Sequence, residues 1–338
     1  MDLLNLFKKK RIFLDYASAT PVLREVRWAM WRYLTWDFYN PNAIYQEGER
    51  VREVVEECRT KIARILGVAK EGVIFTSGGT EANTWALRGV DKGTIVVDSE
   101  SHPSVLDSTE GLETLLWQKD SLLPIDKSTV LISTPIPNNK LGRQVREWRK
   151  KQQSDSPLLH IDASQSAQYF DVGLETLACD MLTLDSAKLY GPKGIGALVL
   201  RRGVKLSLPP QGTPAVPLIV GFTKALEIAA RDKDEERARL SSLSTLFAES
   251  LQQEFPEAVI TQTLPNIVNV SIPNILPELL VLALDKAGVM VSAGPACNSN
   301  KPEPPETPVR ISIGRQTSEK EVKKAIKIFC LTVKNVLN

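Results

Sequence analysis

Short apolar segments recur through the first two thirds of the chain, and segments with the 3.6-residue period of amphipathic helices lie between them. The apolar segments predict buried strands at residues 73–76, 94–97, 129–133, 158–161, 181–184 and 196–200. Because a pair of parallel strands needs a long crossover that is usually a helix, this alternation predicts an α/β fold with a parallel sheet.

Helix patterns surround these strands and continue beyond them. Residues 47–66 place their apolar side chains on one helical face, and residues 217–230 predict another helix. The charge-rich residues 231–239 predict a solvated helix face near a domain boundary. The last helix begins with a capping box of Ser318 and Glu321, whose side chains satisfy the first free amide groups.

The pattern changes after this boundary to that of a smaller α+β unit. Its strands are predicted at residues 267–272, 289–292 and 309–313. We therefore expect a large domain of residues 14–230 and a small C-terminal domain of residues 231–338 together with residues 1–13.

Composition excludes several classes of protein. Forty-two Lys and Arg against 40 Asp and Glu leave a net charge of +2, which gives no strong field for a nucleic acid or a membrane. Two histidines, His102 and His160, and four scattered cysteines exclude zinc fingers and c-type haem, so we expect no metal. Four cysteines are too few for a disulfide scaffold, and no signal peptide or membrane span is evident, so we expect a cytoplasmic protein.

A glycine-rich turn between a strand and a helix is the first stretch with chemical meaning. Residues 73–83 read VIFTSGGTEAN, and such a turn directs free backbone amides and the positive helix end at an anion. Glycines also occur in tight turns that bind nothing, so both interpretations stand at this point. No standard nucleotide loop is present in the sequence.

Two further residues follow predicted strands. Asp162 ends an apolar strand, at the sheet edge where α/β proteins bind ligands, although it also fits a simple turn cap. Lys188 follows another strand and is able to form a Schiff base, although most lysines are surface residues. Pyridoxal phosphate (PLP) needs an amide-lined turn for its phosphate, an amine for its aldehyde and a carboxylate for its ring nitrogen. Thr80, Lys188 and Asp162 are able to supply these three groups.

The chain resembles the cysteine desulfurases of the class V aminotransferase fold. The matching motifs cover nearly the whole chain: residues 14–21, 75–83, 102, 138–139, 162–165, 188–196, 265–271, 297 and 310–315. The resemblance implies the PLP-dependent transferase fold type I, which has a large domain with a mainly parallel sheet flanked by helices and a smaller α+β C-terminal domain.

Four residues are implied to hold the ring of the cofactor. Lys188 would carry the cofactor and later move the α-proton of the substrate, and Asp162 would pair with the ring nitrogen. His102 would stack on the ring, and Gln165 would bond the ring oxygen.

Phosphate and substrate contacts are also implied by the resemblance. Gly79 and Thr80 would bind the phosphate, and Thr213 would reach the phosphate of the partner subunit in a homodimer. Asn139 and Arg310 would bind the substrate, with the guanidinium of Arg310 forming a bidentate pair with the amino-acid carboxylate.

Cys297 matches the sulfur-accepting nucleophile of the family. The resemblance therefore implies conversion of L-cysteine to L-alanine with a persulfide on Cys297, which supplies sulfur for iron-sulfur cluster or thio-cofactor assembly. Only residues 298–309 separate Cys297 from Arg310, and several of them are prolines. We expect this short tether to require an acceptor protein that docks close to the pocket. The other three cysteines, Cys58, Cys179 and Cys330, are expected to be structural.

Several positions depart from the family pattern. Ala187 and Asp185 stand where a His and a Ser usually assist the phosphate, and Tyr45 stands where a His is common. Residues 204–213 are shorter than the usual phosphate-binding segment. A carboxylate beside a phosphate is repulsive unless it turns away or is neutralised.

Two alternatives to a cysteine desulfurase stay open on the sequence. One is another class V PLP reaction, such as that of an aminotransferase, a selenocysteine lyase or a β-lyase. The other is a paralogue that binds the cofactor weakly and acts as an interaction partner in sulfur metabolism. The departures at Ala187 and Asp185 support this second alternative.

Overall fold

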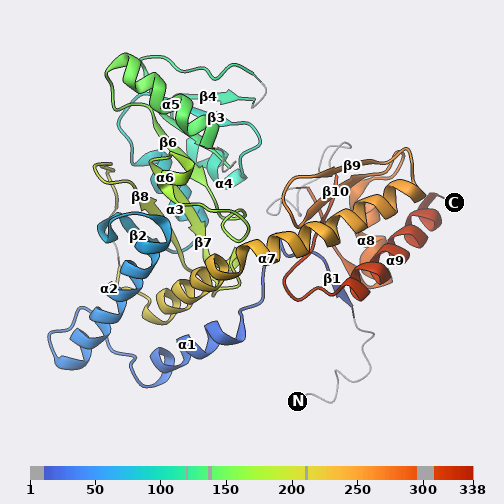
Figure 1. Ribbon diagram of the computed structural model, residues 1–338, viewed down its shortest axis with the longest axis horizontal. Coiled ribbons are helices and arrows are strands. Elements are labelled where there is room, and N and C mark those ends of the chain that lie inside the picture. Colours follow the sequence, from blue (N-terminus) through green and yellow to red (C-terminus); the bar gives the residue numbers. More distant parts are fainter. Residues whose placement is uncertain (1–10, 119–120, 136–138, 210–211, 295–307, 338) are drawn as a thin grey trace. The chain divides into compact units, whose positions relative to one another are not determined.

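The computed structural model describes residues 11–118, 121–135, 139–209, 212–294 and 308–337 (Figure 1). The chain divides into a larger compact unit, Pro21–Lys233, and a smaller one that joins Met1–Thr20 to Asp234–Asn338. That these units are separate folding domains stays a prediction. None of the helices in the described ranges has the length and apolar character needed to cross a membrane.

The larger unit is built on a sheet of seven strands within the described residues. The strands, in spatial order, are β2 (Val73–Thr76), β8 (Gly196–Leu200), β7 (Met181–Asp185), β6 (Leu158–Asp162), β5 (Thr129–Thr134), β3 (Thr94–Asp98) and β4 (Thr114–Trp117). Strand β8 runs antiparallel to both neighbours, and the other pairs are parallel. The predicted mainly parallel sheet is therefore confirmed. The sequence reading missed β4, an edge strand whose Leu115 and Leu116 are exposed.

Helices cover both faces of this sheet, because its central strands are apolar on both sides. In β3 the side chain of Val96 packs into one core cluster, whereas Ile95 and Val97 pack into the other. The first cluster is covered by α2 (Gln46–Leu66), α5 (Asn139–Gln152), α6 (Leu174–Leu177) and the first part of α7 (Val216–Glu254), and it also takes in Val26 of α1 (Arg24–Thr35). The second is covered by α3 (Gly79–Arg88) and α4 (Pro103–Leu106).

Helix α7 is longer than the sequence reading predicted. The helix at 217–230 and the charged face at 231–239 belong to one helix that continues to Glu254. No Gly or Pro interrupts the chain between Gly221 and Pro256, so nothing in the backbone ends the helix earlier.

Within the described residues, the smaller unit combines two sheets with the second half of α7 and two further helices. Its antiparallel sheet has the order β12 (Ser292–Ala293), β13 (Val309–Ser312), β10 (Ile267–Ser271), β9 (Val259–Gln262), and β1 (Ile12–Phe13) pairs in parallel with β11 (Val289–Met290). The single strand predicted at 289–292 is therefore wrong, because β11 and β12 belong to different sheets.

The two helices that lie wholly in this unit are α8 (Pro277–Ala287) and α9 (Glu319–Leu337). The predicted capping box of α9 is confirmed. The Ser318 amide donates to Glu321 Oε2 at 3.1 Å, and the Glu321 amide donates to Ser318 Oγ at 3.3 Å. These two bonds satisfy amide groups that the first turn of a helix leaves without partners.

A buried carboxylate at the start of β7 ties several elements of the larger unit together. Asp180 accepts hydrogen bonds from the Leu159 amide at 2.7 Å, from Arg201 Nε at 2.7 Å and from Arg149 Nη1 at 3.2 Å. Asp180 is 1% exposed and Arg149 is 9% exposed. This ion pair joins α5 to three adjacent strands of the sheet.

Replacing Asp180 by Ala should lower the free energy of unfolding by about 3–5 kcal/mol, because the buried Arg149 loses its counter-ion. Urea denaturation followed by circular dichroism measures this change. Glu175→Ala is the matched control, because Glu175 pairs with Arg146 at 3.2 Å on the surface, and that loss should be under about 1 kcal/mol. If the free energy of unfolding fell equally in the two variants, the Asp180 network would not contribute more than a surface ion pair.

His160 lies in the middle of β6 and links three strands. Its Nδ1 lies 2.9 Å from Ser133 Oγ of β5, and its Nε2 lies 3.0 Å from Thr183 Oγ1 of β7. Complete burial lowers its pKa to about 4, against a smaller opposing effect of Asp162. The ring is therefore neutral at physiological pH and has a structural role.

Because the folded-state pKa of His160 lies below the unfolded value, its stabilising contribution is complete above about pH 6.5 and falls as the pH drops toward 4. The free energy of unfolding should fall by up to about 1.4 kcal/mol per pH unit in this range. His160→Asn removes the titrating group, so denaturation curves between pH 7 and 4.5 should show a shallower dependence. If the free energy of unfolding depended on pH equally in wild type and His160→Asn, the proposed contribution of His160 would be wrong.

Candidate active site

A polar side chain ends each of four neighbouring parallel strands of the larger unit. These residues are Asp98, Thr134, Asp162 and Asp185, at the ends of β3, β5, β6 and β7. Because the strands are parallel, their carboxyl ends meet at one edge of the sheet, where α/β proteins bind ligands. The candidate site therefore lies at this edge.

Asp98 anchors the chain that leads to the candidate site residue His102. Its Oδ2 accepts a hydrogen bond from Thr134 Oγ1 at 3.0 Å, and its Oδ1 accepts one from the Glu100 amide at 2.9 Å. Asp98 is completely buried. The turn before His102 is therefore fixed to the end of β5.

A chain of hydrogen bonds connects Asp162 to His102. Asn83 on α3 donates from Nδ2 to Asp162 Oδ2 at 2.8 Å and to Ser104 Oγ at 3.0 Å. Ser104 Oγ lies 2.7 Å from His102 Nδ1, and the Ser104 amide donates to the same nitrogen at 3.1 Å. Asp162 also accepts from the Ser164 amide at 3.0 Å. The structure thus brings together two of the predicted residues, Asp162 and His102, through two intermediates.

These contacts fix the protonation state of His102. Because the Ser104 amide donates to Nδ1, that nitrogen is the acceptor and the ring proton lies on Nε2. Burial lowers the pKa of His102, Lys188 lowers it further, and Asp162 opposes them. His102 is therefore a neutral ring at physiological pH, which suits stacking on an aromatic cofactor.

Lys188 lies directly after β7, at the end of the short helix η4 (Ser186–Lys188). The side-chain amide of Gln168 donates to its carbonyl oxygen and holds the backbone. The charge of Lys188 lowers the pKa of both His102 and Asp185, so its side chain belongs to the same electrostatic cluster. The structure therefore places Lys188 with Asp162 and His102 at one edge of the sheet.

The glycine-rich turn brings the start of α3 to this edge. A Cβ added to Gly79 would lie 3.1 Å from Ser164 Oγ and 3.2 Å from Asp185 Cβ, so only glycine fits this position easily. Thr80 follows as the second helical residue, with an exposed side chain. Gly79 and Thr80, two of the residues predicted to bind phosphate, thus lie at a helix N-terminus, which favours anions.

The remaining predicted residues of the larger unit lie on its surface or in turns. Gln165 is half-buried in the turn after β6. Asn139 begins α5 and is exposed, and Thr213 is exposed in the segment before α7. Cys297 lies outside the described residues.

Arg310 lies on β13 of the smaller unit and is held on several sides. Its Nη2 donates to Asp15 Oδ1 at 3.0 Å and to Ser18 Oγ at 2.9 Å, and its Nη1 donates to the Gly294 carbonyl at 3.1 Å. Its Nε is buried and has no hydrogen-bond partner among the described residues. Such a restrained guanidinium keeps donor capacity for a further acceptor.

Asn83 and Ser104 received no role from the sequence. One signal was available for Asn83: it is a polar residue between Ala82 and Ala86 on the apolar face of α3, and buried amides need partners. For Ser104 no sequence signal separates its contact to His102 from an ordinary helix start.

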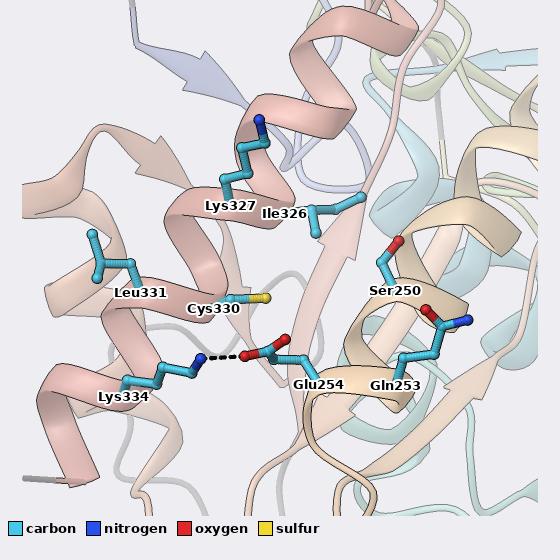
Figure 2. Close-up of a pocket in the computed structure, with 8 residues that line it drawn as sticks. All are labelled: Ser250, Gln253, Glu254, Ile326, Lys327, Cys330, Leu331 and Lys334. Atoms are coloured by element: carbon cyan, nitrogen blue, oxygen red, sulfur yellow. Dashed lines mark ion pairs between the residues drawn. The ribbon is translucent and has the colours of Figure 1, made fainter.

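The other cysteines behave as predicted in part. Cys58 and Cys179 are buried free thiols, and burial raises the pKa of each, that of Cys179 to about 12. Cys330 is partly exposed and faces a surface pocket of about 470 Å³ between α7 and α9 (Figure 2). Burial raises its pKa as well, and none of the predicted site residues lines this pocket.

Comparisons with known proteins agree with this geometry. The Aminotransferase class-V family profile matches residues 12–211 and 209–325. The chain is 32% identical to a cysteine desulfurase IscS of Dictyoglomus turgidum, with 98% of this chain and 92% of the relative aligned. It is 31% identical to cysteine desulfurase IscS 1 of Archaeoglobus fulgidus, with 94% and 95% aligned.

Among solved structures, a NifS-like protein matches with a TM-score of 0.85 at 26% identity, covering 96% of this chain and all of the other. The predicted PLP fold type I is therefore confirmed. The chain belongs to the class V aminotransferase family and, within it, to the cysteine desulfurase family.

Proposed function

We propose that this chain is a PLP-dependent cysteine desulfurase that converts L-cysteine to L-alanine and supplies sulfur for iron-sulfur cluster or thio-cofactor assembly. The hydrogen-bond chain from Asp162 through Asn83 and Ser104 to His102, with Lys188 in the same electrostatic cluster, is the observation that carries this proposal. The family relationship supports it, because the curated relatives are named cysteine desulfurases.

The described residues fit the cofactor. Asp162 accepts two hydrogen bonds that hold its carboxylate in place for a ring nitrogen. The buried Asn83 Oδ1 beside it has no hydrogen-bond partner among the described residues. This oxygen is therefore able to accept a hydrogen bond from a bound ligand. Gly79 and Thr80 begin α3, where the free amides and the positive end of the helix favour an anion.

The predicted residues would then have separate tasks. When bound, PLP supplies an electron sink for the carbon that loses its proton. Lys188 would hold the cofactor and move the α-proton, and Asp162 would keep the ring nitrogen charged. The neutral ring of His102 would stack on the cofactor, and Gln165 would bond its ring oxygen.

Arg310, Asn139 and Cys297 would act on the substrate. Arg310 would pair with the amino-acid carboxylate, helped by Asn139. The Cys297 thiolate would attack the sulfur of the substrate, forming the S–S bond, while the Cβ–S bond breaks and its electron pair goes to Cβ, which takes a proton. Alanine leaves and the persulfide stays, so no outside oxidant or reductant is needed.

One observation favours a second candidate, the weakly cofactor-binding interaction partner. The carboxylate of Asp185 lies beside Gly79, where a phosphate would bind. Other class V reactions differ from the desulfurase in their products, so product analysis separates them from it. The cytoplasmic location and the sulfur-acceptor protein stay predictions.

We further propose that the chain forms a homodimer through the α1 surface, which consists of exposed apolar side chains on α1 and in the segment after it. These side chains are Trp28, Trp31, Leu34, Trp36, Phe38, Ile44 and Tyr45. At least half of each is exposed, and single chains rarely present so many large apolar groups to water. Because dimers are expected for this family, we propose that a second copy of the chain covers the α1 surface.

The purified chain with added PLP should show a visible band that borohydride removes. Cysteine should then yield alanine and a persulfide on wild type, whereas Cys297→Ser should keep the band and form at least ~100-fold less alanine because the sulfur acceptor is gone. Absorbance measures the visible band, amino-acid analysis measures alanine, and alkylation followed by mass spectrometry detects the persulfide.

Cys330→Ser is the matched control for this experiment, because Cys330 is the described thiol that is partly exposed. It should retain wild-type activity. A colourless protein at saturating PLP would favour the interaction-partner candidate, and pyruvate or a keto acid as product would favour another class V reaction.

Sedimentation velocity tests the dimer. Wild type should sediment as a dimer, and Trp28→Glu with Trp36→Glu should shift it toward monomer, because charges would be buried at the interface. Leu122→Glu is the control, since Leu122 is 94% exposed elsewhere in the larger unit. A monomeric wild type contradicts the dimer, and a dimer that survives the double substitution contradicts this surface.

A further inference from the structure

Asp185 places a carboxylate at the start of α3. Its Oδ2 lies 3.4 Å from the position of a Cβ built on Gly79, and the nearby backbone amide of Gly79 lowers the pKa of this carboxyl group. Its Oδ1 accepts from the Ala187 amide at 2.9 Å, which caps the short helix η4. The carboxylate therefore lies where an anionic ligand at this turn would bind.

The backbone holds Asp185 in this position. Asp185 pairs with Gly196 of β8, and Gly196 pairs on its other side with Thr76 of β2. A Cβ on Gly196 would lie 2.8 Å from the Gly78 carbonyl carbon, so the turn before α3 packs directly on β8. This close packing keeps the start of α3 within reach of the Asp185 side chain.

Several charged groups face Asp185 from different elements. Burial raises its pKa, and Asp162 at the end of β6 raises it too. The amides of Ala187 and Gly79 and the ammonium of Lys188 lower it. The charge of Asp185 also acts on His102, before α4, where it raises the pKa of the ring against the larger lowering by burial.

We propose that Asp185 controls phosphate binding at this site: it must take up a proton from solvent before the phosphate group of the cofactor can bind at the start of α3. This inference rests on the proposed function and adds a regulatory residue to it. A carboxylate and a phosphate dianion compete for the same amides, and two like charges this close repel each other. The neutral acid instead donates a hydrogen bond to a phosphate oxygen.

Cofactor affinity therefore falls as the pH rises. Above the pKa of Asp185 in the free protein, each pH unit should weaken PLP binding by up to about tenfold, as one proton is bound per phosphate. Pyridoxal, which lacks the phosphate, should not show this dependence on Asp185.

Titration calorimetry of wild type, Asp185→Asn and Asp185→Ser with PLP tests the proposal. Runs in two buffers of different ionisation heat give the number of protons taken up, and runs from about pH 6.5 to 8.5 give the affinity. The asparagine keeps an oxygen for the Ala187 amide, so the fold should survive, and circular dichroism checks this. Asp185→Ser is the second variant, which restores the hydroxyl common in the family.

At about pH 8 both variants should bind PLP at least ~10-fold more tightly than wild type, and wild type should take up about one proton more. Pyridoxal is the matched control ligand, and its affinity should change far less than that of PLP between the three proteins, because it lacks the phosphate. Equal PLP affinity and equal proton uptake in wild type and variants would overturn the role of Asp185 while leaving the proposed function intact. If all three proteins fail to bind PLP, the proposed function falls and this inference falls with it.

Discussion

The side-chain amide of Asn83 is the group on which the candidate site depends. It donates to Asp162 at the end of β6 and to Ser104 at the start of α4, and Ser104 in turn orients His102. A carboxylate, a neutral ring and two helices are thus fixed by one buried residue. Removing that amide would leave the carboxylate and the serine hydroxyl without a shared donor in a buried environment.

Most of the sheet of the larger unit could be predicted from the sequence, because its central strands are buried on both faces and appear as continuous apolar runs. The exceptions follow from the same principle. Strand β4 has exposed leucines at the sheet edge, and β11 and β12 are two residues each, too short for a periodic signal. The full length of α7 was missed because a charged stretch resembles a boundary even where no helix-breaking residue is present.

The site was only partly predictable. Lys188, Asp162 and Gly79 follow strands or begin a helix, and the topology of parallel strands brings such positions together. His102 could be chosen only by family resemblance, because its role depends on Asn83 and Ser104 from other elements. Asp185 was recognised as a departure, but its contact with the start of α3 depends on how closely Gly196 packs against Gly78, which residue type alone does not reveal.

The Asp180 network has a consequence for the position of Lys188. Asp180 precedes β7, and Lys188 follows it, so one strand connects the ion pair to the amine. With arginines from α5 and from the end of β8 both bound to Asp180, β7 is prevented from slipping along its neighbours. A slip of two residues would preserve the inward and outward pattern of side chains yet move the amine by about 7 Å. The buried carboxylate of Asp180 thus fixes the register of β7 and, with it, the position of the Lys188 amine along the sheet.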